Sequence, residues 1–170
     1  MANDHVSAAF TIRCSAADAA LLEACSDAIE ALHESPSGQD RLRDYAGLGD
    51  SFAEAFPAKV DDPFGSFLDL FPDSEMPGIG CAIERLETGD DGMTEVCFSG
   101  DFVDPEAIAN LLSRAARSAH PVGFEYACSS TKLRPGGFGG GCVVILGDQV
   151  SIFSTSERLC EALNDLAPAA

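Results

Sequence analysis

VSAAFTIRC, residues 6–14, has the clearest structural pattern in the chain, because its apolar and polar side chains alternate. The apolar row is Val6, Ala8, Phe10, Ile12 and Cys14. The polar residues Ser7, Thr11 and Arg13 point the other way. A period of two places one row against a core and the other toward solvent. The sequence therefore predicts a strand with one buried face.

The next residues, SAAD at 15–18, predict the start of a helix. Ser15 is a suitable N-cap, and Asp18 places an acid in the first turn, where the helix dipole favours it. The apolar spacing continues to about Leu32. The expected inward residues are Leu21, Cys25, Ala28, Ile29 and Leu32.

Residues 35–77 differ in composition and are predicted to be an acidic, Phe-rich helical insertion. They are rich in Pro, Gly, Ser and Asp, and Asp62-Pro63 is typical of a helix start. Phe64, Phe67, Leu68 and Phe71 then share one helical face. Two interpretations are open. The favoured one closes these side chains over the open side of the sheet; the other makes them an aromatic anchor within an acidic rim.

Strand and turn patterns return after the insertion. Residues 80–88 and 93–99 flank Gly-Asp-Asp-Gly, a hairpin signal. Asp104-Pro105-Glu106 begins a helix that is expected to reach Ala119, and residues 122–128 form a strand. Residues 142–146 and 149–153 flank Gly147-Asp148 as a second hairpin, and Ser154 or Ser156 opens a last helix.

This order predicts an α+β fold. Strand, helix, strand, strand, helix, strand is the β-α-β-β-α-β order of a ferredoxin-like sandwich, with helices on one face of an antiparallel sheet. Residues 142–170 add a C-terminal hairpin plus helix. A chain of 170 residues with 46% hydrophobic residues is expected to form a single domain over 1–170.

Composition also predicts a cytoplasmic protein. No apolar run approaches the ~20 residues of a membrane span, and the first ten residues do not resemble a secretory signal. The seven cysteines fall singly and are odd in number. They are predicted to be small core residues in a reducing compartment.

The negative charge is confined to the first part of the chain. Residues 1–106 hold 23 Asp and Glu against five Lys and Arg, which gives −18. Residues 107–170 hold five acids and five bases, which gives zero. Such segregation attracts basic partners and repels nucleic acid and anionic membranes. A bias of the whole proteome toward acidic residues would not stop at one position.

The first predicted helix arranges part of this charge in a row. Glu23, Asp27, Glu30 and Glu34 fall within a stripe about 60° wide, opposite the apolar face. Neighbouring carboxylates rise by about 4.5–6 Å along the helix, somewhat less than the spacing of phosphates along DNA. One interpretation is an ordinary solvated helix face in an organism with an acidic, lysine-poor proteome. The other, which we predict, is partner binding by this stripe, aided by acids of the insertion. Those acids are Asp61, Asp62, Asp69 and Asp73.

In size, charge and expected core the chain resembles the acidic DNA-mimic inhibitors of phages and plasmids, and small ferredoxin-like proteins of such elements. The resemblance implies a non-enzymatic inhibitor that blocks a basic, nucleic-acid-binding site of a defence system such as CRISPR or restriction. Immunity or antitoxin proteins that cover a basic toxin share these properties. A third interpretation is an assembly or housekeeping protein whose charge keeps it soluble.

The glycine-rich string TKLRPGGFGGG, residues 131–141, gives a different alternative. Lys132 and Arg134, with backbone amides at Gly137 and Gly139, predict a small-ligand or phosphate-binding domain or enzyme. The lysine precedes the glycines and a strand follows them, so the string is not a Walker loop. A structural turn is the favoured interpretation.

No other pattern predicts catalysis or a cofactor. His5, His33 and His120 lie far apart in the sequence, and neither Asp61-Asp62 nor Asp90-Asp91 has calcium-loop spacing. We therefore expect no metal, no cofactor, no membrane contact and no direct binding of nucleic acid, because a basic patch is also missing from the sequence.

Overall fold

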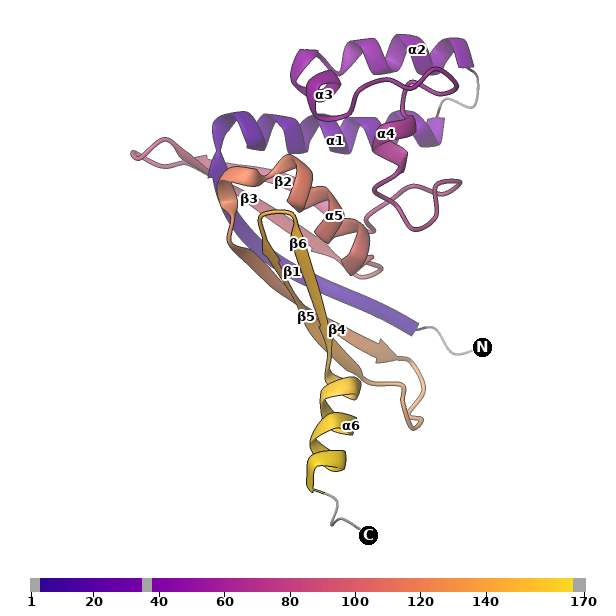
Figure 1. Ribbon diagram of the computed structural model, residues 1–170, viewed down its shortest axis with the longest axis vertical. Helices are drawn as coiled ribbons and strands as arrows, with labels where there is room; N and C mark the ends of the chain where they lie inside the picture. The colour runs from indigo at the N-terminus through magenta and orange to yellow at the C-terminus, as the bar shows by residue number, and fades with distance from the viewer. Residues whose placement is uncertain (1–3, 35–37, 167–170) are drawn as a thin grey trace.

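The computed structural model describes residues 4–34 and 38–166, and Figure 1 shows the arrangement of its elements. The strands are β1 (Asp4–Ser15), β2 (Ala82–Thr88), β3 (Met93–Gly100), β4 (Val122–Ser130), β5 (Gly139–Leu146) and β6 (Gln149–Ser154). The helices are α1 (Ala16–Glu34), α2 (Gly38–Gly47), α3 (Asp50–Ala55), α4 (Gly65–Leu68), α5 (Pro105–Ala115) and α6 (Thr155–Leu166). The predicted α+β class is confirmed.

The strands form one antiparallel sheet in the order β2-β3-β1-β4-β5-β6. β1 lies inside the sheet, between β3 and β4. The C-terminal hairpin extends the same sheet, because β5 pairs with β4 and β6 pairs with β5. The edges of the described sheet are therefore β2 and β6.

The alternating pattern of residues 6–14 is confirmed by the burial of β1. Ile12 is 3% exposed and Cys14 is fully buried, whereas Thr11 and Arg13 are exposed. On the buried side, the Phe10 ring stacks on Phe98 of β3, with ring centroids 5.0 Å apart. It also stacks on Phe124 of β4, at 4.5 Å. Three adjacent strands are thus joined by one row of aromatic rings.

Two of the predicted helix starts, at Ser15 and Asp104, are confirmed by side-chain caps. The Ser15 hydroxyl accepts a hydrogen bond from the Asp18 amide at 3.1 Å. The Asp104 carboxylate accepts from the amides of Glu106 and Ala107, each at 3.0 Å. The second helix ends earlier than predicted: α5 stops at Ala115, and a 3-10 turn follows over Arg117–Ala119.

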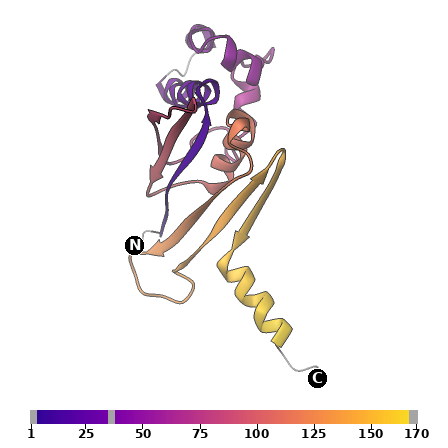
Figure 2. The ribbon, with the colours of Figure 1, turned by 90° about the vertical axis from the view of Figure 1, so that its left-hand side faces the viewer.

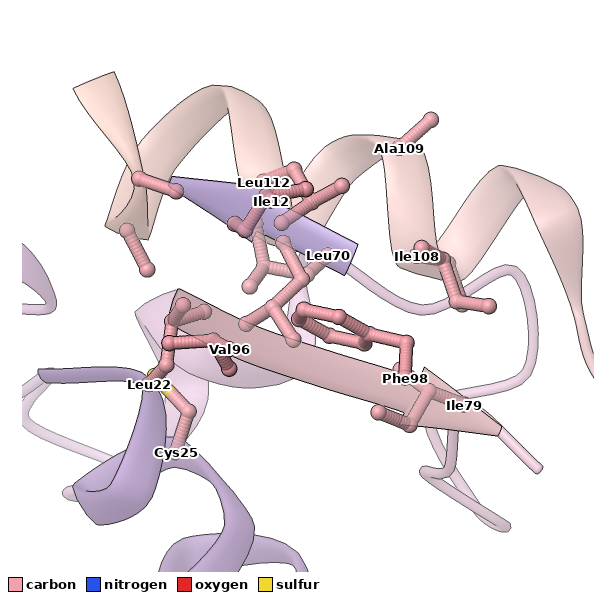
Figure 3. Packing of buried hydrophobic residues seen from close by; sticks show 14 of the residues in the cluster. Ile12, Leu22, Cys25, Leu70, Ile79, Val96, Phe98, Ile108, Ala109 and Leu112 are labelled. Carbon is pink, nitrogen blue, oxygen red and sulfur yellow. The ribbon is translucent and has the colours of Figure 1, made fainter. Parts of the chain in front are cut away.

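The main core lies between the sheet and the helices α1 and α5. Figure 3 shows Val96 and Phe98 of β3 near Leu22 and Cys25 of α1, with residues of α5 on the other side. The buried row of α1 is Ala19, Leu22, Cys25, Ala28 and Leu32. It differs from the prediction, since Leu21 and Ile29 are only half-buried and Leu22 is fully buried.

The insertion adds a further layer on the helices, and its phenylalanines form a second part of the core. Four of them are 0% exposed: Phe52, Phe56, Phe64 and Phe67. Their rings contact one another and Tyr45 at centroid distances of 5.0–6.3 Å. The aromatic-anchor interpretation is therefore wrong, because these rings are inaccessible.

The position of the insertion also differs from the favoured prediction. α2 and α3 contact α1, and Figure 1 places α2, α3 and α4 on the helical side of the molecule. Asn110 of α5 donates to the Leu70 carbonyl at 2.9 Å, and the Arg114 guanidinium lies 5.9 Å from the centre of the Phe56 ring. The insertion covers α1 and α5 rather than the open side of the sheet.

The cysteines only partly follow the core prediction. Cys14 and Cys25 are buried, four others are half-buried and Cys160 is exposed; all seven are free thiols. Burial raises the pKa of the Cys81 thiol to about 12, and nearby Cys97 adds to this shift. Among the helices of the described residues, none has the length and apolar character needed to cross a bilayer.

The aromatic core of the insertion gives a stability prediction. Phe67→Ala should lower the free energy of unfolding by about 3–5 kcal/mol, because it leaves a cavity among buried rings. Phe138→Ala is the matched control: Phe138 is 55% exposed, and a change below about 0.5 kcal/mol is expected. Urea unfolding followed by circular dichroism measures both, and equal losses would contradict the buried position of Phe67.

Candidate functional site

The four acids predicted on the first helix form an exposed stripe on α1. Glu23, Asp27, Glu30 and Glu34 are all exposed, and the opposite side of the helix is buried. We call these four residues the acidic stripe. With a rise of 1.5 Å per residue, the stripe is about 16 Å long. The sequence prediction of a continuous, solvent-facing row is confirmed in its geometry.

The stripe lies on the side of α1 that faces the β2 edge of the sheet. The Arg85 guanidinium of β2 is 3.5 Å from the Glu23 carboxylate. Glu84 and Glu87 on the same strand are exposed and add negative charge to this edge of the sheet. The insertion contacts α1 on another face, so it leaves the four carboxylates accessible.

All five cations in residues 1–106 are already paired with carboxylates. Arg13 pairs with Asp91, Arg41 with Asp62, Arg43 with Asp44, Lys59 with Asp69, and Arg85 with Glu23. Within the described part of the chain, no cation lies within salt-bridge distance of Asp27, Glu30 or Glu34. Three carboxylates of the stripe thus remain available to an external basic partner.

The predicted acids of the insertion are mostly engaged within the insertion itself. Asp62 pairs with Arg41 and accepts from the Phe64 amide at 3.0 Å. Lys59 donates to Asp69 at 2.6 Å. Asp73 accepts from the amides of Glu75 and Met76. Asp61 is exposed. Three of these four side chains therefore hold local structure, and the α1 stripe is the stronger candidate.

Acids of the β2–β3 hairpin are likewise partly structural. The Asp91 carboxylate accepts from the Met93 amide at 3.1 Å and from Arg13 at 2.6 Å. The Met93 amide and the Arg13 guanidinium both lower the pKa of Asp91. Because the folded-state pKa is lowered, this contribution to stability is present at neutral pH and is lost in acid.

The charge segregation of the sequence becomes a separation in space. Figure 1 shows α1 and the insertion at one end of the long axis and α6 at the other. The excess of −18 belongs to residues 1–106, which include α1, the insertion and the β2–β3 hairpin. The molecule therefore concentrates its negative charge at the end that holds α1 and the insertion, whereas α6 at the other end carries three acids and one base.

The residues of the alternative anion site do not form one cluster. Both Asp4 oxygens accept from Arg134, at 2.6 and 2.7 Å. The Gly137 amide donates to the Arg134 carbonyl in a turn, and Gly139 belongs to β5, opposite Cys128. Lys132 is exposed, and no described acid lies within ion-pair distance of it. The glycines serve mainly as turn and strand.

A groove nevertheless lies beside the last glycines, with a volume of about 660 Å³. Its lining residues are Glu125, Tyr126, Gly139, Gly140, Gly141, Cys142, Phe153, Ser154, Thr155 and Arg158. A Cβ at Gly141 would come within 2.6 Å of the Tyr126 hydroxyl, so glycine permits the close approach of that ring. The cation here is Arg158, which sequence patterns did not indicate, and it already pairs with Glu161 at 2.9 Å.

Two of the histidines contact backbone carbonyls. His33 Nε2 lies 2.7 Å from the Pro77 carbonyl, and His120 Nε2 lies 3.1 Å from the Leu112 carbonyl. Both imidazoles thus contact the backbone. In residues 4–34 and 38–166, no group of three or more His, Cys, Asp or Glu side chains is arranged to hold a metal ion.

The acidic stripe should reduce the stability of the free protein. Asp27→Asn, Glu30→Gln and Glu34→Gln together should raise the free energy of unfolding by about 1 kcal/mol at low salt, since like charges at these spacings repel. The gain should shrink at high salt. Urea titrations at two salt concentrations measure it.

The matched control removes the same charge at three scattered positions, with Glu75→Gln, Asp101→Asn and Glu125→Gln. These residues are exposed and do not share a helix. The control should gain less than the stripe variant. Equal gains would mean that net charge, and not the row, causes the repulsion.

Known proteins offer no further guide to this site. Comparison of the chain with protein-family models, curated proteins and solved structures found no match. The function is therefore inferred from the charges and surfaces of this chain alone.

Proposed function

We propose that this chain is an acidic, non-enzymatic binding protein that blocks a basic site on another macromolecule. The site best suited to it is one that holds nucleic acid, as in a CRISPR or restriction complex, which makes the protein a DNA-mimic inhibitor. The acidic stripe carries the proposal. It presents three exposed carboxylates without a described cation partner, on a helix that is packed against the core.

The physical basis is an exchange of partners at the target. A groove that binds nucleic acid is lined with Lys and Arg, which the stripe would contact in place of phosphates. The backbone of α1 is already ordered by its packing against the core. Binding therefore costs little backbone entropy. Arg85 remains beside Glu23, so Asp27, Glu30 and Glu34 form the proposed contact.

A charge that served solubility alone would require no row of like charges. Charged surface residues normally alternate in sign, and a same-sign row costs stability. An immunity or antitoxin protein that covers a basic toxin would use the same chemistry. It differs in its target, which the competition experiment below distinguishes.

The groove beside Gly139–Gly141 supports a second candidate, a small-ligand site. Arg158 and Tyr126 would supply its polar contacts, and burial raises the pKa of Tyr126, which keeps its hydroxyl protonated at neutral pH. Lys132 and Arg134 do not line this groove. The predicted basic pair would thus act outside it, which makes this candidate the weaker one.

We also propose a ferredoxin-like core and a cytoplasmic location. The order β2-β3-β1-β4, with α1 and α5 as the connecting helices, supports that core, to which β5 and β6 are added. The seven free cysteines are in keeping with a reducing compartment.

The binding test is a low-salt capture from lysate with the tagged full chain, repeated with excess duplex DNA. Capture of a nucleic-acid-binding protein, and its release by DNA, is the expected result. Capture that DNA leaves unchanged would support the immunity-type alternative instead. Failure to capture any basic protein would contradict the proposal.

With a captured target, the stripe can be tested directly. Asp27→Asn, Glu30→Gln and Glu34→Gln together should weaken binding roughly tenfold or more, with a smaller dependence on salt, because charge pairs with the target are lost. The scattered control, Glu75→Gln, Asp101→Asn and Glu125→Gln, should weaken binding much less. Equal effects would show that net charge is recognised without the stripe; isothermal titration calorimetry measures both.

A further inference from the structure

A groove of about 420 Å³ lies along one flank of α1, between this helix and the segment that leads into β2. Ser26, Ile29 and His33 line it from α1, and residues 78–82 and 99–100 line it from the other side. Figure 2 shows α1 nearly end-on, with β2 and β3 on one side of the helix and the insertion on another. The groove is therefore on the same side of α1 as the ion pair between Arg85 and Glu23.

The wall of the groove opposite α1 is tightly packed backbone. A Cβ atom on Gly80 would come within 1.8 Å of the Phe102 carbonyl oxygen, and Gly80 has a φ of +67°. A Cβ atom on Gly100 would come within 2.3 Å of the Gly80 carbonyl oxygen. Only glycine permits backbone segments to approach so closely. This wall is therefore formed before any ligand binds, as is usual for binding grooves.

The groove is uncharged and largely apolar. No Asp, Glu, Lys or Arg is among the described residues that line it. Ile79 is 3% exposed and Ile29 is half-buried. Burial raises the pKa of the Cys81 thiol to about 12, so this side chain is neutral at pH 7. The His33 ring lies 2.7 Å from the Pro77 carbonyl at one end. Apolar groups of a ligand would thus find a suitable surface here.

The acidic stripe places a carboxylate at the rim of this groove. Glu30 follows Ser26 by four residues and precedes His33 by three, so it is a neighbour of both on the surface of α1. Glu30 is exposed, and in the described parts of the chain no cation lies within ion-pair distance of it. An uncharged groove beside an available carboxylate is complementary to a ligand with an apolar stem and a cationic head.

We propose that the groove takes the alkyl stem of a lysine or arginine side chain from the basic partner, whose charged head pairs with Glu30. These two side chains cover apolar surface with their stems and keep the charge at the tip. This inference rests on the proposed function and adds to it. The stripe by itself would recognise positive charge, whereas the groove also selects a cation by the length of its stem.

Two peptides of equal charge test this selection on the full chain. Hexalysine and hexaornithine differ by one methylene group in each side chain. A fully buried methylene contributes about 0.8 kcal/mol, which is about fourfold in affinity. Isothermal titration calorimetry at low salt should show hexalysine binding about two- to fourfold more tightly. Equal affinities would overturn the groove and leave the proposed function standing. Failure of both peptides to bind would overturn both.

Filling the groove should remove the preference for lysine. Ser26→Leu adds an apolar side chain inside the groove without changing the charge, and leucine also favours the helix. The ratio of the two affinities should then approach one. Ala20→Leu is the matched control, because Ala20 is exposed on the opposite flank of the stripe. It should keep the ratio of the unchanged chain. Equal ratios in the two variants would overturn the proposal.

Further variants keep the test valid if Ser26→Leu fails to fold. Ala82→Val narrows the groove from the other side, at an exposed position of a strand, and should also bring the ratio toward one. Glu30→Gln should weaken hexalysine binding more than Asp27→Asn, although each removes one charge, because Glu30 lies at the rim and Asp27 lies farther around the helix. Equal losses from Glu30→Gln and Asp27→Asn would contradict the position proposed for the cation.

Discussion

The Phe10 ring of β1 stacks between Phe98 of β3 and Phe124 of β4, and this stacking joins three adjacent strands of the sheet. β1 forms hydrogen-bonded ladders with both β3 and β4, so the hydrophobic row of one early strand organises segments that lie far away in sequence. Aromatic pairs of this kind contribute about 0.5–1.5 kcal/mol each beyond their buried area. α1 and α5 pack on the same side, which fixes the exposed side of α1.

The acidic stripe is possible because the opposite side of α1 is well buried. Leu22 and Cys25 are fully buried, and Leu32 is 8% exposed. Full burial of one large apolar side chain stabilises by about 1.5–3 kcal/mol, whereas one pair of like charges on a helix costs a few tenths. The core therefore holds the carboxylates in a row despite their repulsion. All the nearby cations are occupied, so the row keeps its charge for a partner.

The two ends of the molecule present different surfaces. The acidic end presents side-chain charge, and its β2 edge is protected from strand pairing by charges and a register shift. The other end presents an uncharged edge strand and an apolar helix side.

Local patterns in the sequence were enough to predict most elements and the stripe. Period-two alternation, caps at Ser15 and Asp104, and helical spacing of Glu23, Asp27, Glu30 and Glu34 act over a few residues, so a linear chain displays them. The tertiary structure decided what depends on distant residues. It placed the phenylalanines against α1 and α5, directed Arg134 to Asp4, and engaged Asp62, Asp69 and Asp73 within the insertion. Spacing in sequence does not encode these partners, because they depend on which surfaces meet after the chain has folded.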